Sequence, residues 1–240
     1  MNTILFDIET SALVSRTWGT VDQSVIKVVK DWKILCFSYK KLGEKKTFVE
    51  SLRNQTEKSL IKKLHSVLDE ADVVIAHNGN RFDIRKVNAK FVEYGLPPTP
   101  DYHKIDTLKV ARKYFAFTSN RLDDLGKLLG VGEKVKHPGF EMWEGCERGE
   151  AKWFDLMEKY NRQDVNLLEK VYYKLYPWVR NHPNVNVIDN KENSCPNCGS
   201  ENLQRRGYGF TRTGKYQRFQ CKECGAWSRG RNTVTNVTIR

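Results

Sequence analysis

The hydrophobic pattern of the N-terminal half predicts several short strands. Residues 3–10, TILFDIET, alternate between apolar and polar positions, which is the period of a strand with one buried face. Residues 24–40 hold two apolar runs about the KDW turn, and residues 47–49 predict a further strand. Residues 72–77, DVVIAH, are almost wholly apolar, which is typical of a strand that is buried on both faces.

The rest of the chain is mainly helical in pattern. Apolar residues at helical spacing predict helices over residues 56–70, 81–94, 107–114, 121–129 and 150–176, with Asp106 as an N-cap. The predicted order is strands first, then strands mixed with helices, then helices. This order predicts an α/β sheet with helices on both faces. Residues 181–193 lack a helical stripe and are rich in Asn, so we interpret them as a linker before a separate C-terminal unit.

Length and charge narrow the class of protein. The 240 residues suit one large and one small domain. No apolar run approaches the roughly 18 residues of a transmembrane helix, and the N-terminus lacks a basic leader, so we expect a cytoplasmic protein. The net charge of +12 indicates a polyanionic partner, and residues 194–240 hold nine basic residues against two acids. A basic surface that only favours solubility is the alternative.

Acidic residues at three places suggest a metal site. Asp7 and Glu9 lie two apart on the first strand, so both side chains leave the same face. Asp83 follows the buried strand and its turn, near the edge where open α/β sheets form sites. Tyr160 and Asp164 share one helix face with an apolar stripe, so Asp164 points toward the core side. Acids in such places need a neutralising cation, and oxygen ligands favour Mg²⁺ or Mn²⁺.

Each acid also has a plain structural explanation. Asp7 and Glu9 could be solvated on an edge strand. Asp83 could be a first-turn acid that the helix dipole favours, and Asp164 could lie at the rim of an apolar helix face. The metal interpretation rests on three separate segments that deliver acids toward one sheet.

These residues carry a family resemblance. FDIET at residues 6–10, continued by Leu13, resembles the first motif of the DEDD, or DnaQ-like, exonucleases. AHNGNRFD at 76–83 resembles the second motif, and YNRQD at 160–164 resembles the third in its DEDDy form. The resemblance covers about residues 1–180 and extends to proofreading domains of DNA polymerases and to stand-alone phage and bacterial nucleases. A phage-encoded protein in a bacterial host is therefore one expectation.

The resemblance implies a ribonuclease H-like fold, with a mixed five-stranded sheet whose three strands at one end are antiparallel. It implies a 3′→5′ exonuclease that hydrolyses phosphodiester bonds with two Mg²⁺ or Mn²⁺ ions. Asp7 would then bridge both ions, Glu9 and Asp164 would hold the first, and Asp83 would hold the second largely through water. Tyr160 would orient the attacking water, because a phenol with a pKa near 10 is a poor base at neutral pH.

The same resemblance implies contacts with the terminal nucleotides by Thr10, Leu13, Asn78 and Phe82. Leu13 could wedge between the last two bases, and Phe82 could pack on a base or a sugar, with a place in the core as its equal alternative. His77, His103 and Asp106 have ordinary structural explanations as strand end, loop and helix cap, so we leave them out of the predicted site.

Four cysteines near the C-terminus predict a second metal site. CPNCG at 195–199 and CKECG at 221–225 are paired knuckles, and four thiolates at such spacing suit structural Zn²⁺. The segment resembles a zinc ribbon. We therefore divide the chain into an exonuclease-like domain at 1–182, a linker at 183–193, a zinc ribbon at 194–232 and a tail at 233–240. The zinc ligands would be Cys195, Cys198, Cys221 and Cys224, whereas Cys36 and Cys146 are isolated.

The segment between the knuckles combines aromatic and basic residues. Such interleaving suits base stacking and phosphate contact. The alternative is that the aromatic residues form the small core of the ribbon. The aromatic residues are Tyr208, Phe210, Tyr216 and Phe219, and the predicted phosphate contacts are Arg205, Arg206, Arg212, Lys215 and Arg218.

The leading prediction is thus a metal-dependent exonuclease, with DNA favoured over RNA and single-stranded 3′ ends favoured as substrate. One alternative is a nucleic-acid-binding protein without activity, which the complete set of acids argues against. The other is an endonuclease or structure-specific nuclease with the same centre, which the motifs do not separate from an exonuclease.

Overall fold

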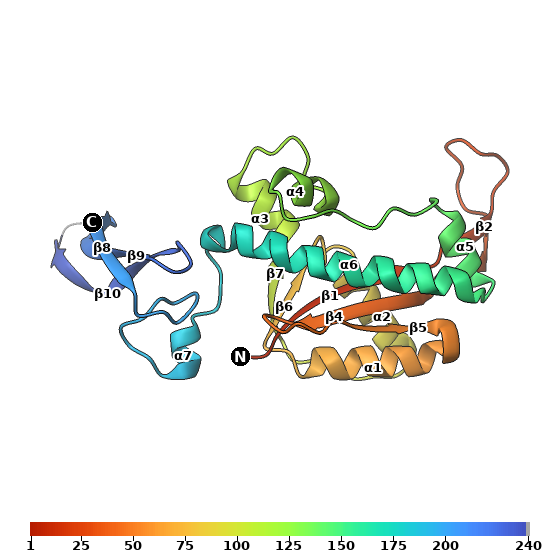
Figure 1. The fold of residues 1–240 in the computed structure, drawn as a ribbon, viewed down its shortest axis with the longest axis horizontal. Coiled ribbons are helices and arrows are strands. Elements are labelled where there is room, and N and C mark those ends of the chain that lie inside the picture. The colour runs from red at the N-terminus through yellow and green to blue at the C-terminus, as the bar shows by residue number, and fades with distance from the viewer. Residues whose placement is uncertain (239–240) are drawn as a thin grey trace. The chain divides into compact units, whose positions relative to one another are not determined.

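The computed structural model describes residues 1–238, which divide into two compact units. One unit is Asn2–Val171, and the other comprises Met1 and the described residues from Tyr172 onward. The larger unit contains a five-stranded sheet in the order β5-β4-β1-β6-β7 (Figure 1). Its strands are β1 (Thr3–Thr10), β4 (Ile34–Lys41), β5 (Phe48–Ser51), β6 (Val73–Ala76) and β7 (His103–Asp106).

The sheet is mixed. β4 runs antiparallel to both of its neighbours, β5 and β1, whereas β6 and β7 continue the sheet parallel to β1. The predicted α/β class with a mixed five-stranded sheet is therefore confirmed. β1 is the central strand, so the alternative that its acids are solvated on an edge strand is wrong.

Helices cover the two faces of this sheet with separate apolar cores. Phe6 and Ile8 of β1 pack with α1 (Glu57–Asp69) and α2 (Asp83–Glu93) in one cluster. On the other face, residues of β4 pack with α5 (Glu141–Glu147) and α6 (Ala151–Leu175). Burial of each large apolar side chain stabilises the fold by roughly 1.5–3 kcal/mol. The alternation of β1 thus directs Phe6 and Ile8 into one core and leaves its acids on the face of α6.

A buried ion pair joins α6 to the sheet. Lys40 Nζ of β4 lies 2.5 Å from Glu169 Oε2 of α6, and the backbone N–H of Gly43 donates to Glu169 Oε1 at 3.0 Å. These contacts fix the helix along the sheet, so that its earlier turns lie over the acidic face of β1.

Three elements of this unit differ from the sequence prediction. β3 (Lys27–Lys30) pairs with β2 (Val14–Arg16) in a separate hairpin and is fully exposed, so only one of the two strands predicted at 24–40 joins the main sheet. His103 begins β7 and is not in a loop, because the parallel ladder with β6 recruits this short segment. Helix α5 was not predicted, and α3 (Thr107–Tyr114) and α4 (Leu122–Leu128) lie close to their predicted places.

The C-terminal unit has a three-stranded antiparallel sheet in the order β10-β9-β8. Its strands are β8 (Leu203–Phe210), β9 (Gly214–Cys221) and β10 (Trp227–Asn236). A short helix, α7 (Val185–Asp189), lies inside the predicted linker, where Asn184 accepts a hydrogen bond from the N–H of Asn186 at 3.1 Å. Local capping by Asn thus forms a turn of helix without an apolar stripe. β10 also enters the predicted tail, whose last two residues, 239–240, lie outside the described part.

No helix within residues 1–238 combines the length and the apolar character that a bilayer requires.

Candidate functional site

Three acids converge on the face of the sheet that α6 covers. Asp7 and Glu9 leave β1 on this face, and Asp164 comes from the middle of α6. Their ligand oxygens lie within 4.8 Å of one another. Asp7 and Glu9 are half-buried, whereas Asp164 is buried. Such a group is a typical oxygen cage for a divalent cation.

Asp83 approaches the same strand from the turn after β6. It is the first residue of α2 and is buried, and its Oδ1 accepts a hydrogen bond from the backbone N–H of Ile8 at 3.2 Å. Ile8 lies between the two acids of β1, so Asp83 is close to them without joining the group of three. Asp83 thus stands in the first turn of α2, as its structural explanation expects, and is in addition buried against β1.

The turn that carries Asp83 depends on Gly79. A Cβ at this position would lie 2.3 Å from the Cβ of Ala76, which is far inside van der Waals contact. Asn78, which precedes it, has a φ of 66°, in the left-handed region that Asn tolerates better than most residues. The Asn-Gly pair thus allows β6 to reverse into α2 within a few residues.

The electrostatics of the acids are dominated by burial. Desolvation, followed by the nearby carboxylates, raises the pKa of Asp7 well above its usual range. Burial is also the largest cause for Glu9, whose pKa rises to about 8, and for Asp83, whose pKa rises to about 7. The pKa of Asp164 is raised for the same reason, although Lys134 opposes the shift. Without a bound cation this centre therefore holds protons at neutral pH.

An observation on Asp164 supports a cation at this place. Its Oδ2 accepts a hydrogen bond from Lys134, but its Oδ1 is buried and has no hydrogen-bond partner among the described residues. A buried oxygen without a partner is costly, and a metal ion would satisfy it. The residues present therefore fit a divalent cation, which Asp7, Glu9 and Asp164 would hold.

Lys134 is a cation that sequence reasoning missed. It lies in the segment between α4 and α5, and its Nζ is 2.5 Å from Asp164 Oδ2 and 2.8 Å from Tyr160 Oη. Burial opposes its charge, but Asp164 and Tyr160 together raise the pKa of Lys134. No periodic pattern or motif marks this lysine, because its position depends on how the segment folds back over α6.

Tyr160 lies one helical turn before Asp164 and is buried. Desolvation and the charge of Asp164 raise the pKa of Tyr160, so its phenol stays neutral at physiological pH. The hydroxyl accepts the hydrogen bond from Lys134 and can donate its own proton to an oxygen nearby. This arrangement suits orientation of a water molecule and not abstraction of its proton.

Two further side chains orient the acids of β1. Asn161 Nδ2 donates to Asp7 Oδ2 at 2.7 Å, and Trp143 Nε1 of α5 donates to Glu9 Oε2 at 3.1 Å. His137 packs edge-on against both Trp143 and Tyr160. Asn161 stands inside the YNRQD motif, which is the only sequence signal that could have found it. Trp143 lies on the helix that was not predicted.

Asp106 and His77, for which the sequence predicted structural roles, hold the turn between β6 and α2. Asp106 caps α3, as predicted, by accepting from the N–H of Leu108 at 3.0 Å. It also accepts from the N–H of Asn78 at 2.9 Å and of Asn80 at 3.3 Å.

His77 lies 2.9 Å from Thr107 Oγ1 and 3.0 Å from the carbonyl of Asn120, and burial lowers the pKa of His77 to about 4. The structural roles of Asp106 and His77 therefore serve the turn that carries Asp83.

The predicted nucleotide contacts are accessible to different degrees. Leu13 and Phe82 are exposed, so the alternative that Phe82 belongs to the core is wrong. Thr10 ends β1 and Asn78 begins the turn after β6, and both are half-buried. Thr10 and Leu13 follow the acids of β1 in sequence, and Asn78 and Phe82 precede Asp83.

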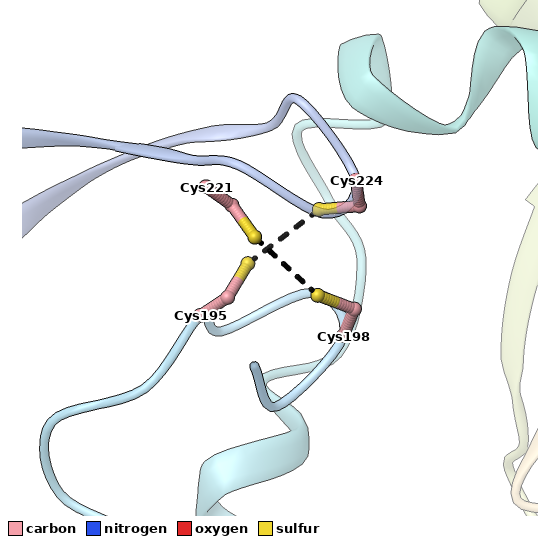
Figure 2. A group of neighbouring side chains, drawn as sticks. All are labelled: Cys195, Cys198, Cys221 and Cys224. Atoms are coloured by element: carbon pink, nitrogen blue, oxygen red, sulfur yellow. Dashed lines mark hydrogen bonds between the residues drawn. The ribbon is translucent and has the colours of Figure 1, made fainter. Parts of the chain in front are cut away.

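The four cysteines of the C-terminal unit form a compact cluster (Figure 2). The Sγ atoms of Cys195 and Cys224 lie 3.7 Å apart, and those of Cys198 and Cys221 lie 3.6 Å apart. A tetrahedron with Zn–S bonds of about 2.3 Å has edges of about 3.8 Å. The sulfur positions therefore fit one tetrahedral zinc ion.

The sheet beside this cluster exposes aromatic and basic side chains. Phe210 is 75% exposed and Tyr208 is also exposed, so these two do not form a core, whereas Tyr216 and Phe219 are half-buried. Lys215 Nζ lies 4.1 Å from the ring centroid of Tyr208. The guanidinium groups of Arg206 and Arg218 lie 5.6 and 5.5 Å from the ring centroid of Trp227. The other two predicted phosphate contacts, Arg205 and Arg212, are exposed.

Known proteins resemble this chain over different parts of its length. The DNA polymerase III PolC-type of Ureaplasma parvum serovar 3 (strain ATCC 700970) is 28% identical over 148 residues, which cover 53% of this chain. The chain spans only 10% of that polymerase. Among solved structures, the family B DNA polymerase from the hyperthermophilic archaeon Pyrobaculum calidifontis has a TM-score of 0.48 and 13% identity. That alignment covers 88% of this chain and 31% of the polymerase.

A family model gives the assignment. Residues 4–176 match the RNase_H superfamily. The matched region contains the five-stranded sheet, the three acids that converge on it and Asp83. Because the match includes well over half of the chain, this protein belongs to the RNase H superfamily.

Proposed function

We propose that the protein is a metal-dependent 3′→5′ exonuclease of the DEDDy type. The observation that carries the proposal is the group of Asp7, Glu9 and Asp164, with one buried oxygen of Asp164 left without a partner. Membership in the RNase H superfamily supports nucleic acid as substrate and phosphodiester hydrolysis as reaction. The raised pKa values supply an electrostatic reason for the centre to bind cations.

In this proposal, two Mg²⁺ or Mn²⁺ ions would stabilise the attacking and leaving oxygens at phosphorus. Asp7 would hold both ions, and Glu9 and Asp164 would complete the first site. Asp83 would serve the second site largely through water, consistent with its place outside the close group of three. Asn161 and Trp143 would keep one oxygen each of Asp7 and Glu9 oriented by hydrogen bonds.

Tyr160 would orient the attacking water with its neutral hydroxyl. Lys134 would fix the direction of that hydroxyl, because the ammonium donates to Tyr160 Oη and leaves the phenolic proton free for another acceptor. Before a metal binds, Lys134 would also neutralise part of the charge on Asp164.

The proposed substrate is DNA, with single-stranded 3′ ends favoured. The similarity to a DNA polymerase supports DNA over RNA. Thr10, Leu13, Asn78 and Phe82 would contact the terminal nucleotides, and the exposure of Leu13 and Phe82 is consistent with that role. An endonuclease with the same centre is the competing function, and a protein without activity is the other.

For the C-terminal unit we propose a zinc ribbon that binds nucleic acid, in the domain arrangement 1–182, 183–193, 194–232 and 233–240. The sulfur distances in the cluster support zinc. The exposed Phe210 and Tyr208 support base stacking, and the surrounding cations support phosphate contact. The cations are Arg205, Arg206, Arg212, Lys215 and Arg218.

The deciding experiment follows the degradation of 5′-labelled DNA and RNA oligonucleotides with Mg²⁺ or Mn²⁺. An exonuclease gives a ladder that shortens from the 3′ end, and the ladder disappears when that end is blocked. Asp7→Ala should abolish the ladder, because it removes a bridging ligand, while far-UV circular dichroism stays that of the wild type. Wild-type degradation by the Asp7→Ala variant would refute the assignment of the centre. Cleavage of end-blocked or circular substrates would favour the endonuclease.

A further inference from the structure

The β2–β3 hairpin, residues 14–30, exposes an unusual amount of apolar surface. Its large apolar side chains in solvent include Trp18, Val21, Val25, Ile26, Val28 and Val29, and Trp18 is 88% exposed. The hairpin is ordered by its own backbone, since the N–H of Ile26 donates to the carbonyl of Arg16 at 2.9 Å. In Figure 1 the segment between the two strands projects from the larger unit beside α5. Apolar surface of this kind contributes nothing to the core and indicates a binding partner.

Helix α5 fixes the base of this hairpin near the acids. Glu147 Oε1 accepts from the backbone N–H of Ala12 at 3.1 Å, and its Oε2 lies 2.8 Å from Lys30 Nζ. One turn earlier on the same helix, Trp143 donates to Glu9. The hairpin therefore stands at the rim of the acidic centre, held by the helix that also orients one of the acids.

A basic groove lies at the base of the hairpin. It has a volume of about 470 Å³, and its lining includes Lys30, Lys33, Arg53 and Arg148. Among the described residues Lys33 forms no ion pair, so its charge is available to a ligand. The other three cations pair with acids, Lys30 with Glu147, Arg53 with Asp155 and Arg148 with Glu150. The lining still holds four cations against two acids, Glu57 and Glu147, and this excess of positive charge suits the phosphates of a polynucleotide.

We propose that the hairpin and the groove bind a single strand of nucleic acid a few nucleotides away from the cleaved end. Trp18 stacks on a base, and Lys33 contacts a phosphate. This inference rests on the proposed function, because it assigns the surface to the same polymer. Charge and position favour this occupant: the groove has an excess of cations, the most exposed large apolar side chain is the aromatic ring of Trp18, and a polymer that leaves the acids must pass their rim. A protein partner or a second copy of the chain would need no cationic groove.

The test measures binding without hydrolysis. Fluorescein-labelled (dT)₂₀ and (U)₂₀ are titrated in Ca²⁺ and followed by anisotropy, with wild type, Trp18→Ala, Lys33→Gln and the control Val92→Ala. Val92 is a similarly exposed apolar residue on α2. Trp18→Ala should weaken binding of the preferred polymer by about 5- to 100-fold, the usual effect of losing one stacked base. Lys33→Gln should reduce the slope of log K against log salt by about 0.7, and Val92→Ala should match the wild type.

Hydrolysis of (dT)₃ at saturating concentration then separates the two proposals. Trp18→Ala should cleave it at the wild-type rate, because so short a substrate does not reach the hairpin. Loss of long-polymer affinity in a protein that hydrolyses nothing would support the hairpin and refute the exonuclease. Wild-type affinity of Trp18→Ala for both polymers would overturn the hairpin proposal even if the enzyme is active. A change from dimer to monomer in Trp18→Ala by light scattering, with polymer binding unchanged, would assign the surface to a second copy and overturn it too.

Discussion

Replacing Lys134 with Met tests whether this lysine acts on the acids through its charge. Met keeps the length and most of the volume of the side chain but removes the ammonium. In the wild type, Lys134 lowers the pKa values of Asp7, Glu9 and Asp164 against the larger effect of burial. Without it, these pKa values should rise further, and the ionised centre should become less stable.

The expected loss can be estimated from the geometry. Two unit charges about 4 Å apart interact by about 4 kcal/mol at an effective dielectric constant of 20. The Lys134 side chain is 29% exposed, so solvent screens part of this energy and we expect a loss of about 2 kcal/mol. For a protein of this size that corresponds to roughly 4–8 °C in Tm.

The pH dependence of that loss distinguishes charge from packing. An acid whose pKa is raised in the folded state stabilises the fold below its unfolded pKa, and this stabilisation is lost as the pH rises through the folded pKa. The stabilisation from Glu9 is therefore lost as the pH rises through about 8, and that from Asp83 as it rises through about 7. At pH 5 Glu9 and Asp83 are largely protonated, so the deficit of Lys134→Met should be smaller than at higher pH. At pH 9 the difference should be largest.

The assay is thermal unfolding at pH 5 and pH 9, in buffer free of Mg²⁺ and Mn²⁺ and again with saturating Mn²⁺. Mn²⁺ should remove most of the deficit, and the variant should bind Mn²⁺ more tightly, because the ammonium no longer competes for Asp164. Lys127→Met is the matched control, since Lys127 pairs with Asp123 on the surface and is 53% exposed. An equal deficit at both pH values, with and without Mn²⁺, would show that Lys134 contributes only packing.

Three further predictions concern the turn at Gly79, Tyr160 and the C-terminal unit. Gly79→Ala places a Cβ 2.3 Å from that of Ala76 and should lower stability by about 1–3 kcal/mol while slowing turnover, measured by denaturant unfolding and initial rates; an unchanged midpoint would contradict this. Tyr160→Phe should reduce turnover by up to roughly 10²–10⁴ while substrate affinity stays the same, and wild-type turnover would leave Tyr160 a packing residue. Arg205→Gln with Arg212→Gln should reduce the salt slope of oligonucleotide binding by about 1.4, whereas identical slopes would favour a different partner for this unit.

The sequence predicted those parts of the fold that local pattern determines. β1 was found from its alternation and β6 from its apolar run, because each strand contributes a regular face to a core. β7 was missed because only Ile105 and Asp106 of its four residues are buried, and its ladder with β6 decides its conformation. The strand at β3 was predicted from its apolar run, but β2 and its separate pairing with β3 were missed, because apolar residues that face solvent run against the usual meaning of such a pattern.

The residues of the candidate site also fall into those that local sequence predicted and those that it did not. Asp7, Glu9, Asp83, Tyr160 and Asp164 stand in short motifs, so spacing alone marked them. Their partners do not. Lys134 reaches Asp164 across 30 positions of sequence, and Trp143 reaches Glu9 across 134. Such contacts depend on how the segment from α4 to α5 folds over α6, and no local periodicity of the sequence predicts that fold.

The charges of the centre imply that metal and substrate assist each other's binding. A cluster of ionised acids repels the phosphates of a polynucleotide, yet burial and mutual repulsion keep these acids partly protonated when no cation is present. A divalent cation would displace the protons and reverse the local charge, so the centre would attract phosphate only after the metal binds. The phosphate would in turn supply oxygen ligands that the protein lacks. Metal affinity should therefore rise when an oligonucleotide is present, by the same factor by which the metal raises oligonucleotide affinity.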